Sequence, residues 1–163
     1  MENMTGKVWI LGDDIDTDII IPTEYLAMKT IDDMKQYAFS PLRPELAGQI
    51  QKGDIIVAGK NFGCGSSREQ APEIIKALGI QCVIAKSFAR IFFRNAINNG
   101  LLLIEQPNLY DDIKEGDTIT VHMNKHVDYN GKEYPIAALP ENLMRIIQAG
   151  GLVGAMRKLN GLD

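Results

Sequence analysis

Three short apolar runs, separated by segments of helical length, lie in the middle of this 163-residue chain. The runs at residues 55–58, 82–85 and 101–104 show no polar alternation, as in strands that are buried on both faces. Between them, apolar residues recur at helical spacing, and Gly79 and Gly100 stand where the two helices should end. Parallel neighbours need crossover connections of this length, so the pattern predicts a parallel sheet at the centre of an α/β fold.

Within this centre, Ser87 is expected to cap a helix over residues 88–99. Shorter elements are expected on both sides of the centre. Upstream, the patterns favour a strand at 8–11, extended chain at 19–21 and a helix over 31–39. Downstream, they favour a strand at 118–122, a hairpin turned at Asn130-Gly131 and a helix over 140–149. The hairpin indicates additional antiparallel structure. Because no repeat, low-complexity tract or linker interrupts the chain, we expect residues 1–163 to form a single domain.

Composition excludes several classes of protein. The net charge is −4, and the 17 Lys and Arg residues are scattered among 21 acids, which leaves no basic surface for a nucleic acid. No stretch approaches the roughly 20 apolar residues of a membrane span, so we expect a cytoplasmic protein. Its two cysteines, Cys64 and Cys82, fit a reducing compartment better than a disulfide scaffold. They are also too few to hold an iron–sulfur cluster, which normally takes three or four thiolates.

A loop rich in glycine and serine, residues 60–69, follows the first buried strand and is called the glycine–serine loop below. It stands at the crevice where open α/β sheets bind ligands. Its free N–H groups attract anions, and Arg68 offers a planar fork to a carboxylate. The same residues also form a capping box, with Ser66 as N-cap and Glu69 as its partner. An anion site and a cap are both open at this point, and they are not exclusive.

Other sites are disfavoured by spacing. The loop lacks the third glycine of a dinucleotide fingerprint, the Gly-Lys-Ser/Thr of a P-loop and the Gly-x-Ser-x-Gly of a hydrolase. His122 and His126 flank a strand of the expected hairpin, and we interpret them as solvated, since a pair four apart is expected to share a metal only on a helix. The acidic turn Asp14-x-Asp16-x-Asp18 begins like a calcium loop but lacks the required glycine and glutamate, which favours an Asx-type turn.

Three segments, in a fixed order, are specific enough to point to a family. Residues 12–22 read GDDIDTDIIIP, residues 59–72 read GKNFGCGSSREQAP, and residues 86–95 read KSFARIFFRN. Together they resemble the small subunits of 3-isopropylmalate dehydratase and their relatives in the aconitase superfamily. The resemblance implies a swivelling three-layer β/β/α domain with a parallel central sheet and an additional antiparallel sheet. It also implies a large partner subunit that carries a [4Fe-4S] cluster, in a heterodimer or heterotetramer, and a small dicarboxylate substrate.

The resemblance also implies roles for individual residues. Ser66 is expected to remove a proton from the substrate carbon, while an iron of the partner's cluster polarises the substrate hydroxyl. The loop N–H groups, Ser67 and Arg68 are expected to stabilise the serine oxyanion and to bind the substrate carboxylate. Asp18 matches an acidic residue that assists proton transfer. Cys64 is not expected to be a cluster ligand, because in this family the thiolates come from the large subunit.

The segment at residues 25–30 resembles the specificity loop of these subunits, with Leu26, Ala27 and Met28 as substrate-binding residues. At Ala27, relatives that act on tricarboxylic acids place an arginine. A small apolar residue instead suits a branched alkyl group, since a buried carboxylate without a partner is costly. This favours isopropylmalate, isomerised by dehydration and rehydration in leucine biosynthesis. The alternatives are a related hydro-lyase acting on 2,3-dimethylmalate or homoaconitate, and a stand-alone module that binds a carboxylate metabolite.

Overall fold

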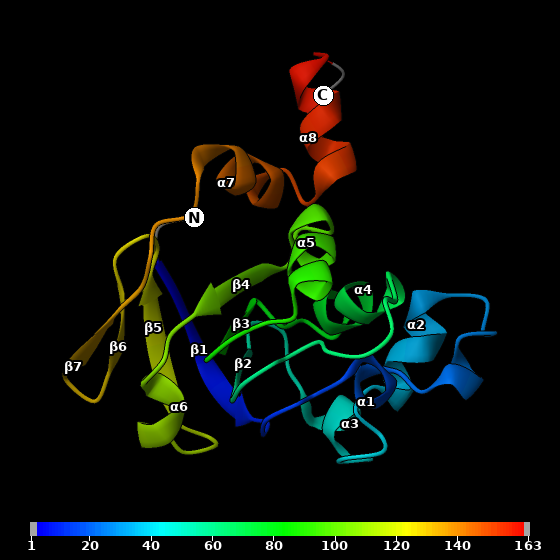
Figure 1. Cartoon of the computed structure of the whole chain (residues 1–163), viewed down its shortest axis with the longest axis horizontal. Coiled ribbons are helices and arrows are strands. Elements are labelled where there is room, and N and C mark those ends of the chain that lie inside the picture. The colour runs from blue at the N-terminus through cyan, green and yellow to red at the C-terminus, as the bar shows by residue number, and fades with distance from the viewer. Residues whose placement is uncertain (1–2, 162–163) are drawn as a thin grey trace.

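The computed structural model describes residues 3–161 (Figure 1). Its strands are β1 (Asn3–Ile10), β2 (Ile55–Ala58), β3 (Cys82–Ala85), β4 (Leu102–Glu105), β5 (Thr118–His122), β6 (His126–Tyr129) and β7 (Lys132–Pro135). Its helices are α1 (Thr17–Ile20), α2 (Ile31–Met34), α3 (Leu46–Gln49), α4 (Gln70–Ala77), α5 (Arg90–Asn98), α6 (Leu109–Asp112), α7 (Glu141–Gln148) and α8 (Leu152–Leu159), with 3-10 turns η1 (Thr23–Tyr25) and η2 (Lys35–Tyr37). No helix within residues 3–161 is long and apolar enough to cross a membrane.

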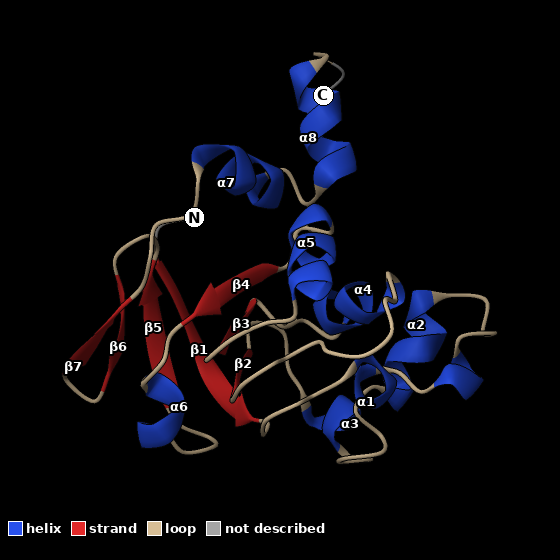
Figure 2. Cartoon of the chain, in the orientation of Figure 1, coloured by secondary structure: helices blue, strands red, loops and turns tan. Residues whose placement is uncertain are grey.

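One curled sheet contains the seven strands of residues 3–161, in the order β4-β3-β2-β1-β5-β6-β7 (Figure 2). Strands β1 to β4 are parallel, and Ile56 of β2 lies between Trp9 of β1 and Val83 of β3. Strands β5 to β7 are antiparallel and join the sheet through the first half of β1, where Thr5 lies opposite Thr120. The predicted fold class, a parallel centre with added antiparallel strands, is therefore confirmed, and the two parts share the long strand β1.

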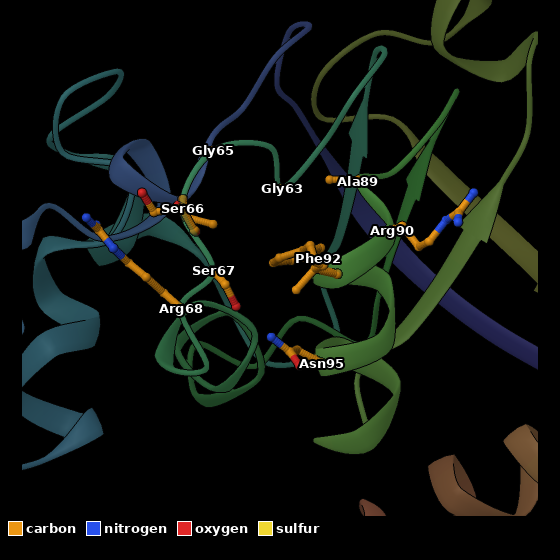
Figure 3. Close-up of a pocket in the computed structure, with 11 residues that line it drawn as sticks. Gly63, Gly65, Ser66, Ser67, Arg68, Ala89, Arg90, Phe92 and Asn95 are labelled. Carbon is orange, nitrogen blue, oxygen red and sulfur yellow. The ribbon is translucent and has the colours of Figure 1, made fainter.

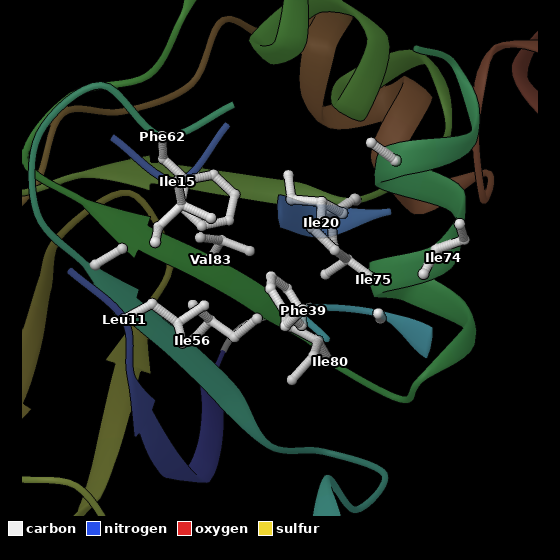
Figure 4. Packing of buried hydrophobic residues seen from close by; sticks show 14 of the residues in the cluster. Leu11, Ile15, Ile20, Phe39, Ile56, Phe62, Ile74, Ile75, Ile80 and Val83 are labelled. Atoms are coloured by element: carbon white, nitrogen blue, oxygen red, sulfur yellow. The ribbon is translucent and has the colours of Figure 1, made fainter. Parts of the chain in front are cut away.

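Alternate residues of the parallel strands enter two different cores, which explains why these strands are apolar throughout. On one face, Ile56 and Val83 pack with Ile20 and Phe39 under the helices α1 to α5 (Figure 4). On the other face, Val57 and its neighbours pack against α7 and the antiparallel strands. Helices, parallel sheet and antiparallel sheet thus form the three layers of a β/β/α fold.

The hairpin between β6 and β7 turns at Asn130-Gly131, as predicted. Both residues have positive φ angles, 51° and 80°, which the favoured two-residue hairpin turns require. Asn tolerates this conformation and Gly has no Cβ to oppose it. The turn fixes a register in which Asp128 of β6 lies opposite Glu133 of β7.

Two local predictions upstream of the parallel centre are wrong. The chain expected to be extended at 19–21 is mostly the short helix α1, because the Asp16 carboxylate accepts the Ile19 N–H at 2.8 Å and caps the helix. Only Ile21 of that segment is extended. The helix expected over 31–39 is an α-helix only to Met34 and a 3-10 turn to Tyr37, and it stops before Phe39, which adopts a φ of 61° and is fully buried in the core. Packing of one aromatic ring outweighs the local helical pattern there.

Candidate active site

The acidic turn and the glycine–serine loop lie side by side, although their residues are 47 positions apart in sequence. The Asp13 carboxylate accepts the Lys60 N–H at 2.7 Å. The buried Thr17 hydroxyl donates to the Ser66 carbonyl at 2.6 Å, and the Thr17 N–H donates to the Cys64 carbonyl at 2.9 Å. These bonds join two sequence motifs into one site at the carboxyl ends of β1 and β2.

The third motif supports the glycine–serine loop from the other side. The Ser87 hydroxyl accepts the Asn61 N–H at 2.8 Å, so it holds the loop and does not cap α5, which begins only at Arg90. The predicted Ser87 cap is therefore wrong. Gly63 has a φ of 85°, and a Cβ added there would overlap the ring of Phe92. Glycine at this position lets α5 pack directly on the backbone of the loop.

A cavity of about 220 Å³ opens between the glycine–serine loop and α5 (Figure 3). Both serines of the loop line it, together with Asn95 of α5. Figure 3 shows the side chains of Ser67 and Asn95 pointing toward one another across the gap, whereas those of Arg68 and Arg90 extend away from it on opposite sides. Cavities for drug-sized ligands measure roughly 300 Å³ or more, so this one suits a small molecule with polar ends.

Ser66 is exposed and does not cap a helix. Helix α4 begins at Gln70, and its N-cap, Glu69, makes no side-chain cap hydrogen bond, so the predicted capping box is wrong. Within residues 3–161 the Ser66 hydroxyl has no hydrogen-bond partner. In the same part of the chain, the N–H groups of Gly65, Ser66 and Ser67 donate to no backbone acceptor. The loop itself, rather than the first turn of α4, therefore presents free donors to an anion.

Arg68 and Asp18 are paired with each other. Arg68 Nη2 lies 2.5 Å from Asp18 Oδ1, Nη1 donates to the Ile21 carbonyl at 2.8 Å, and Nη2 donates to the Thr23 hydroxyl at 2.8 Å. Only 13% of the Arg68 side chain is exposed, against 63% of the Asp18 side chain. The guanidinium is thus bound to residues 18–23, and an incoming carboxylate would meet the loop N–H groups first.

The segment expected to set specificity lies outside the cavity. Leu26 and Met28 are half-buried and pack on the core, whereas Ala27 is exposed. None of these three residues lines the cavity at Ser66. Tyr25 stacks on Tyr37 with ring centroids 4.1 Å apart, which ties the start of this segment to η2. The structure therefore brings Ser66, Ser67, Arg68 and Asp18 together and leaves residues 26–28 apart from them.

The two cysteines do not fit a cluster site. Burial raises the pKa of the Cys64 thiol, and the negative charges of Asp16 and Asp14 raise it further. Burial alone raises the pKa of the Cys82 thiol to about 12. Iron–sulfur clusters bind three or four thiolates, and within residues 3–161 neither cysteine belongs to a group of metal-ligating side chains. We derive no cluster ligand from this chain.

Two residues of the site have no role that the sequence motifs predict. Thr17 connects the acidic turn to the Ser66 carbonyl through a tertiary hydrogen bond, which no local pattern encodes. Asn95 lines the cavity from α5. The sequence could have predicted a place for Asn95 beside the site, because this residue follows Phe92 by three positions on one helix face and ends the third motif.

Known proteins of similar sequence and structure show the family of this chain. Residues 15–109 match the aconitase C-terminal domain family. The chain is 77% identical over 162 residues to the 3-isopropylmalate dehydratase small subunit of Lachnospira eligens, covering 99% of each chain. It is 52% identical over 157 residues to 3-isopropylmalate dehydratase small subunit 1 of Archaeoglobus fulgidus, covering 94% of this chain and 97% of the relative. The crystal structure of 3-isopropylmalate dehydratase LeuD from Methanocaldococcus jannaschii matches with a TM-score of 0.92 at 39% identity, covering 98% of this chain and 96% of that one.

The match over residues 15–109, together with the mixed α/β fold, shows that this chain is a member of the aconitase C-terminal domain family. The similarity continues through the region after residue 109, where the family match ends. Within that family, the chain belongs to the small subunits of 3-isopropylmalate dehydratase. The family predicted from the three sequence motifs is confirmed.

Proposed function

We propose that this chain is the small subunit of a hydro-lyase that interconverts 2-isopropylmalate and 3-isopropylmalate by dehydration and rehydration in leucine biosynthesis. It works in the cytoplasm with a large subunit that carries a [4Fe-4S] cluster, and residues 1–163 act as one swivelling domain. The observation that carries the proposal is the meeting of Ser66, free loop N–H groups and the Asp18–Arg68 pair beside one small cavity. Two free thiols are in keeping with a reducing compartment.

The cluster of the partner, when bound, supplies a Lewis acid for the substrate hydroxyl, and this chain supplies the base. A serine hydroxyl loses its proton only where its oxyanion is stabilised. The N–H groups of Gly65, Ser66 and Ser67 are free for that purpose and cost no reorganisation during the reaction. The exposed Ser66 hydroxyl releases its own proton to solvent, and the oxyanion takes a proton from the substrate carbon. During rehydration to the isomer, Ser66 delivers that proton to the adjacent carbon, which first carried the hydroxyl.

Arg68 and Asp18 act as a pair in this proposal. A substrate carboxylate can replace the neutral acceptors of the Arg68 guanidinium, the Ile21 carbonyl and the Thr23 hydroxyl, while Asp18 remains its charged partner. A charged acceptor binds the fork more strongly than a neutral one. The Asp18 carboxylate is largely exposed, so it can exchange a proton with a group of the large subunit.

The preference for isopropylmalate rests on the apolar segment Leu26, Ala27 and Met28. Because this segment lies outside the cavity, the substrate pocket is completed only in the assembled enzyme. The exposed Ala27 then contacts the alkyl group of the substrate. An arginine at position 27 would offer a partner to a third carboxylate of the substrate, but this chain has an alanine there.

Reconstitution tests the proposal. The purified chain alone should be colourless and inactive, because two thiols cannot hold the cluster. Addition of the cluster-loaded large subunit should start interconversion of the two isopropylmalates. Chromatographic separation of the two isomers measures this conversion. Activity of this chain alone, without iron, would refute the proposal. A stand-alone carboxylate-binding module would instead bind isopropylmalate in calorimetry with the same affinity whether or not the large subunit is present.

A further inference from the structure

Metal-ligating side chains gather on one face of the outer antiparallel strands. His122 of β5 lies opposite His126 of β6, and Asp128, two residues further along β6, lies opposite Glu133 of β7. Residues that face one another across strands, or that are two apart on one strand, share a face of the sheet. The neighbouring Val127 points into the core, so these four side chains point outward.

The two histidines are therefore not the separate solvated residues that sequence analysis expects. A pair four residues apart shares a face on a helix, but an antiparallel hairpin with a short turn brings the same pair into direct opposition. The imidazole rings of His122 and His126 lie with their centroids 4.6 Å apart and their planes tilted by 35°. The sequence contains no other histidine, so both histidines of the chain meet at this place.

The donor atoms converge on one point. The Asp128 carboxylate contacts both rings, with Oδ2 2.7 Å from His122 Nε2 and Oδ1 3.0 Å from His126 Nε2. Glu133 Oε2 lies 3.5 Å from His126 Nε2 at the edge of the group. Ligand atoms of a tetrahedral zinc site, with bonds of about 2.1 Å, are about 3.4 Å apart. An ion therefore needs only small side-chain shifts to take its place among these atoms.

Charge and exposure also suit a cation. With neutral imidazoles the group carries two negative charges, which match a divalent ion. The side chains of His122, His126 and Asp128 are 26%, 23% and 42% exposed, so an ion reaches them from solvent while packing limits their rotamers. A simple ion pair needs one imidazole for one carboxylate. Here two Nε2 atoms approach one carboxylate, and a second carboxylate lies beside them.

We propose that His122, His126 and Asp128 bind a divalent transition-metal ion of the Zn²⁺ type, with Glu133 contributing negative charge at the edge of the site. Two imidazoles and a carboxylate favour such ions over Ca²⁺ and Mg²⁺, which prefer oxygen ligands throughout. The three ligands are the only such group of His, Cys, Asp and Glu side chains within residues 3–161. Strands β5 and β6 lie at the other end of the sheet from α4 and the glycine–serine loop (Figure 1), so we assign the ion a structural role, in which it joins β5 to β6.

Calorimetric titration of the chelator-treated chain with Zn²⁺ tests this site. We expect one ion per chain and a rise in the midpoint of thermal unfolding, because an ion that binds only the folded chain stabilises it. Removal of a residue that merely supports a metal ligand costs 10-fold to 100-fold in affinity, so His126→Asn, which removes a ligand, should weaken binding at least about 10-fold. His122→Asn should weaken Zn²⁺ binding to the same extent. Circular dichroism checks the folding of both variants, so that one of them can be used if the other folds poorly.

Two control variants separate this site from unspecific binding. Asp32→Asn removes an exposed carboxylate from α2 and should bind Zn²⁺ like the unaltered chain. Cys64→Ser removes the more exposed thiol and should also leave the affinity unchanged. Equal affinity in the unaltered chain and the folded histidine variants would overturn the proposal, and so would the absence of saturable binding. Because no partner subunit or catalytic turnover is involved, these outcomes are independent of the proposed enzymatic function.

Discussion

Ser66→Ala should leave the fold intact while it removes most of the activity of the reconstituted enzyme. The Ser66 side chain is exposed, its hydroxyl has no partner within residues 3–161, and α4 starts four residues later at Gln70. A serine that capped this helix would stabilise the chain by about 1 kcal/mol. Because Ser66 caps nothing, we expect the free energy of unfolding to change by no more than about 0.5 kcal/mol, as for an ordinary surface substitution.

The kinetic effect of the same substitution should be far larger. Loss of a single donor to an oxyanion costs about 10²- to 10³-fold in kcat. Alanine at position 66 removes the proton acceptor itself, so we expect a loss of at least about 10³-fold, which corresponds to about 4 kcal/mol of activation free energy. KM should change little, because Arg68 and the loop N–H groups remain available to the substrate carboxylate.

Steady-state kinetics of the reconstituted enzyme and thermal unfolding of the small subunit measure the two effects separately. Ser40→Ala is the matched control, since this half-buried serine lies outside the cavity and makes no side-chain hydrogen bond within residues 3–161. Turnover within about 10-fold of the unaltered enzyme would refute the role of Ser66 as base, because that is less than the loss of one oxyanion donor. A stability loss near 1 kcal/mol with unchanged turnover would identify a structural serine.

Further substitutions test the surroundings of Ser66. Arg68→Lys should raise KM for isopropylmalate in steady-state assays, because an ammonium cannot keep three planar contacts; an unchanged KM would exclude Arg68 from substrate binding. Thr17→Val should cost about 1 kcal/mol in chemical unfolding and also lower kcat, since it deletes the hydroxyl bond to the Ser66 carbonyl; a stability loss without a kinetic one would contradict a positioning role. Ala27→Arg should shift the kcat/KM ratio toward a tricarboxylic substrate, and an unchanged ratio would remove the support for isopropylmalate. Native Cys64 should react with iodoacetamide more slowly than in the unfolded chain at pH 8, because its raised pKa lowers the thiolate fraction; equal rates would contradict that shift.

The centre of the fold could be predicted from the sequence because burial on both faces leaves an unambiguous signal. The runs at 55–58 and 82–85 coincide with β2 and β3, since each of their residues enters one of two cores. The Asn130-Gly131 turn was equally clear, because few residues tolerate two successive positive φ angles. In these places, the local sequence and the tertiary structure impose the same requirement.

Tertiary contacts decide the places where prediction failed. Ser87 has the composition of a helix cap, yet its hydroxyl serves the Asn61 N–H of a loop 26 residues away. His122 and His126 have the spacing of unrelated surface residues, yet the register of β5 and β6 opposes them. Neither partner can be deduced from the residues nearby, because both depend on which strands become neighbours.

The candidate site shows the same division between chemistry and arrangement. Sequence motifs predicted the participants Ser66, Arg68 and Asp18, because their residue types carry the chemistry. They did not predict that Arg68 is largely buried and holds Asp18 through the same fork that a substrate would use. The segment at residues 26–28 also lies outside the cavity, so the free chain presents the proposed catalytic groups beside a cavity that the proposed specificity segment does not line. We therefore expect the Arg68 contacts to Ile21 and Thr23 to persist in the free chain and to be exchanged only when substrate and the large subunit are both in place.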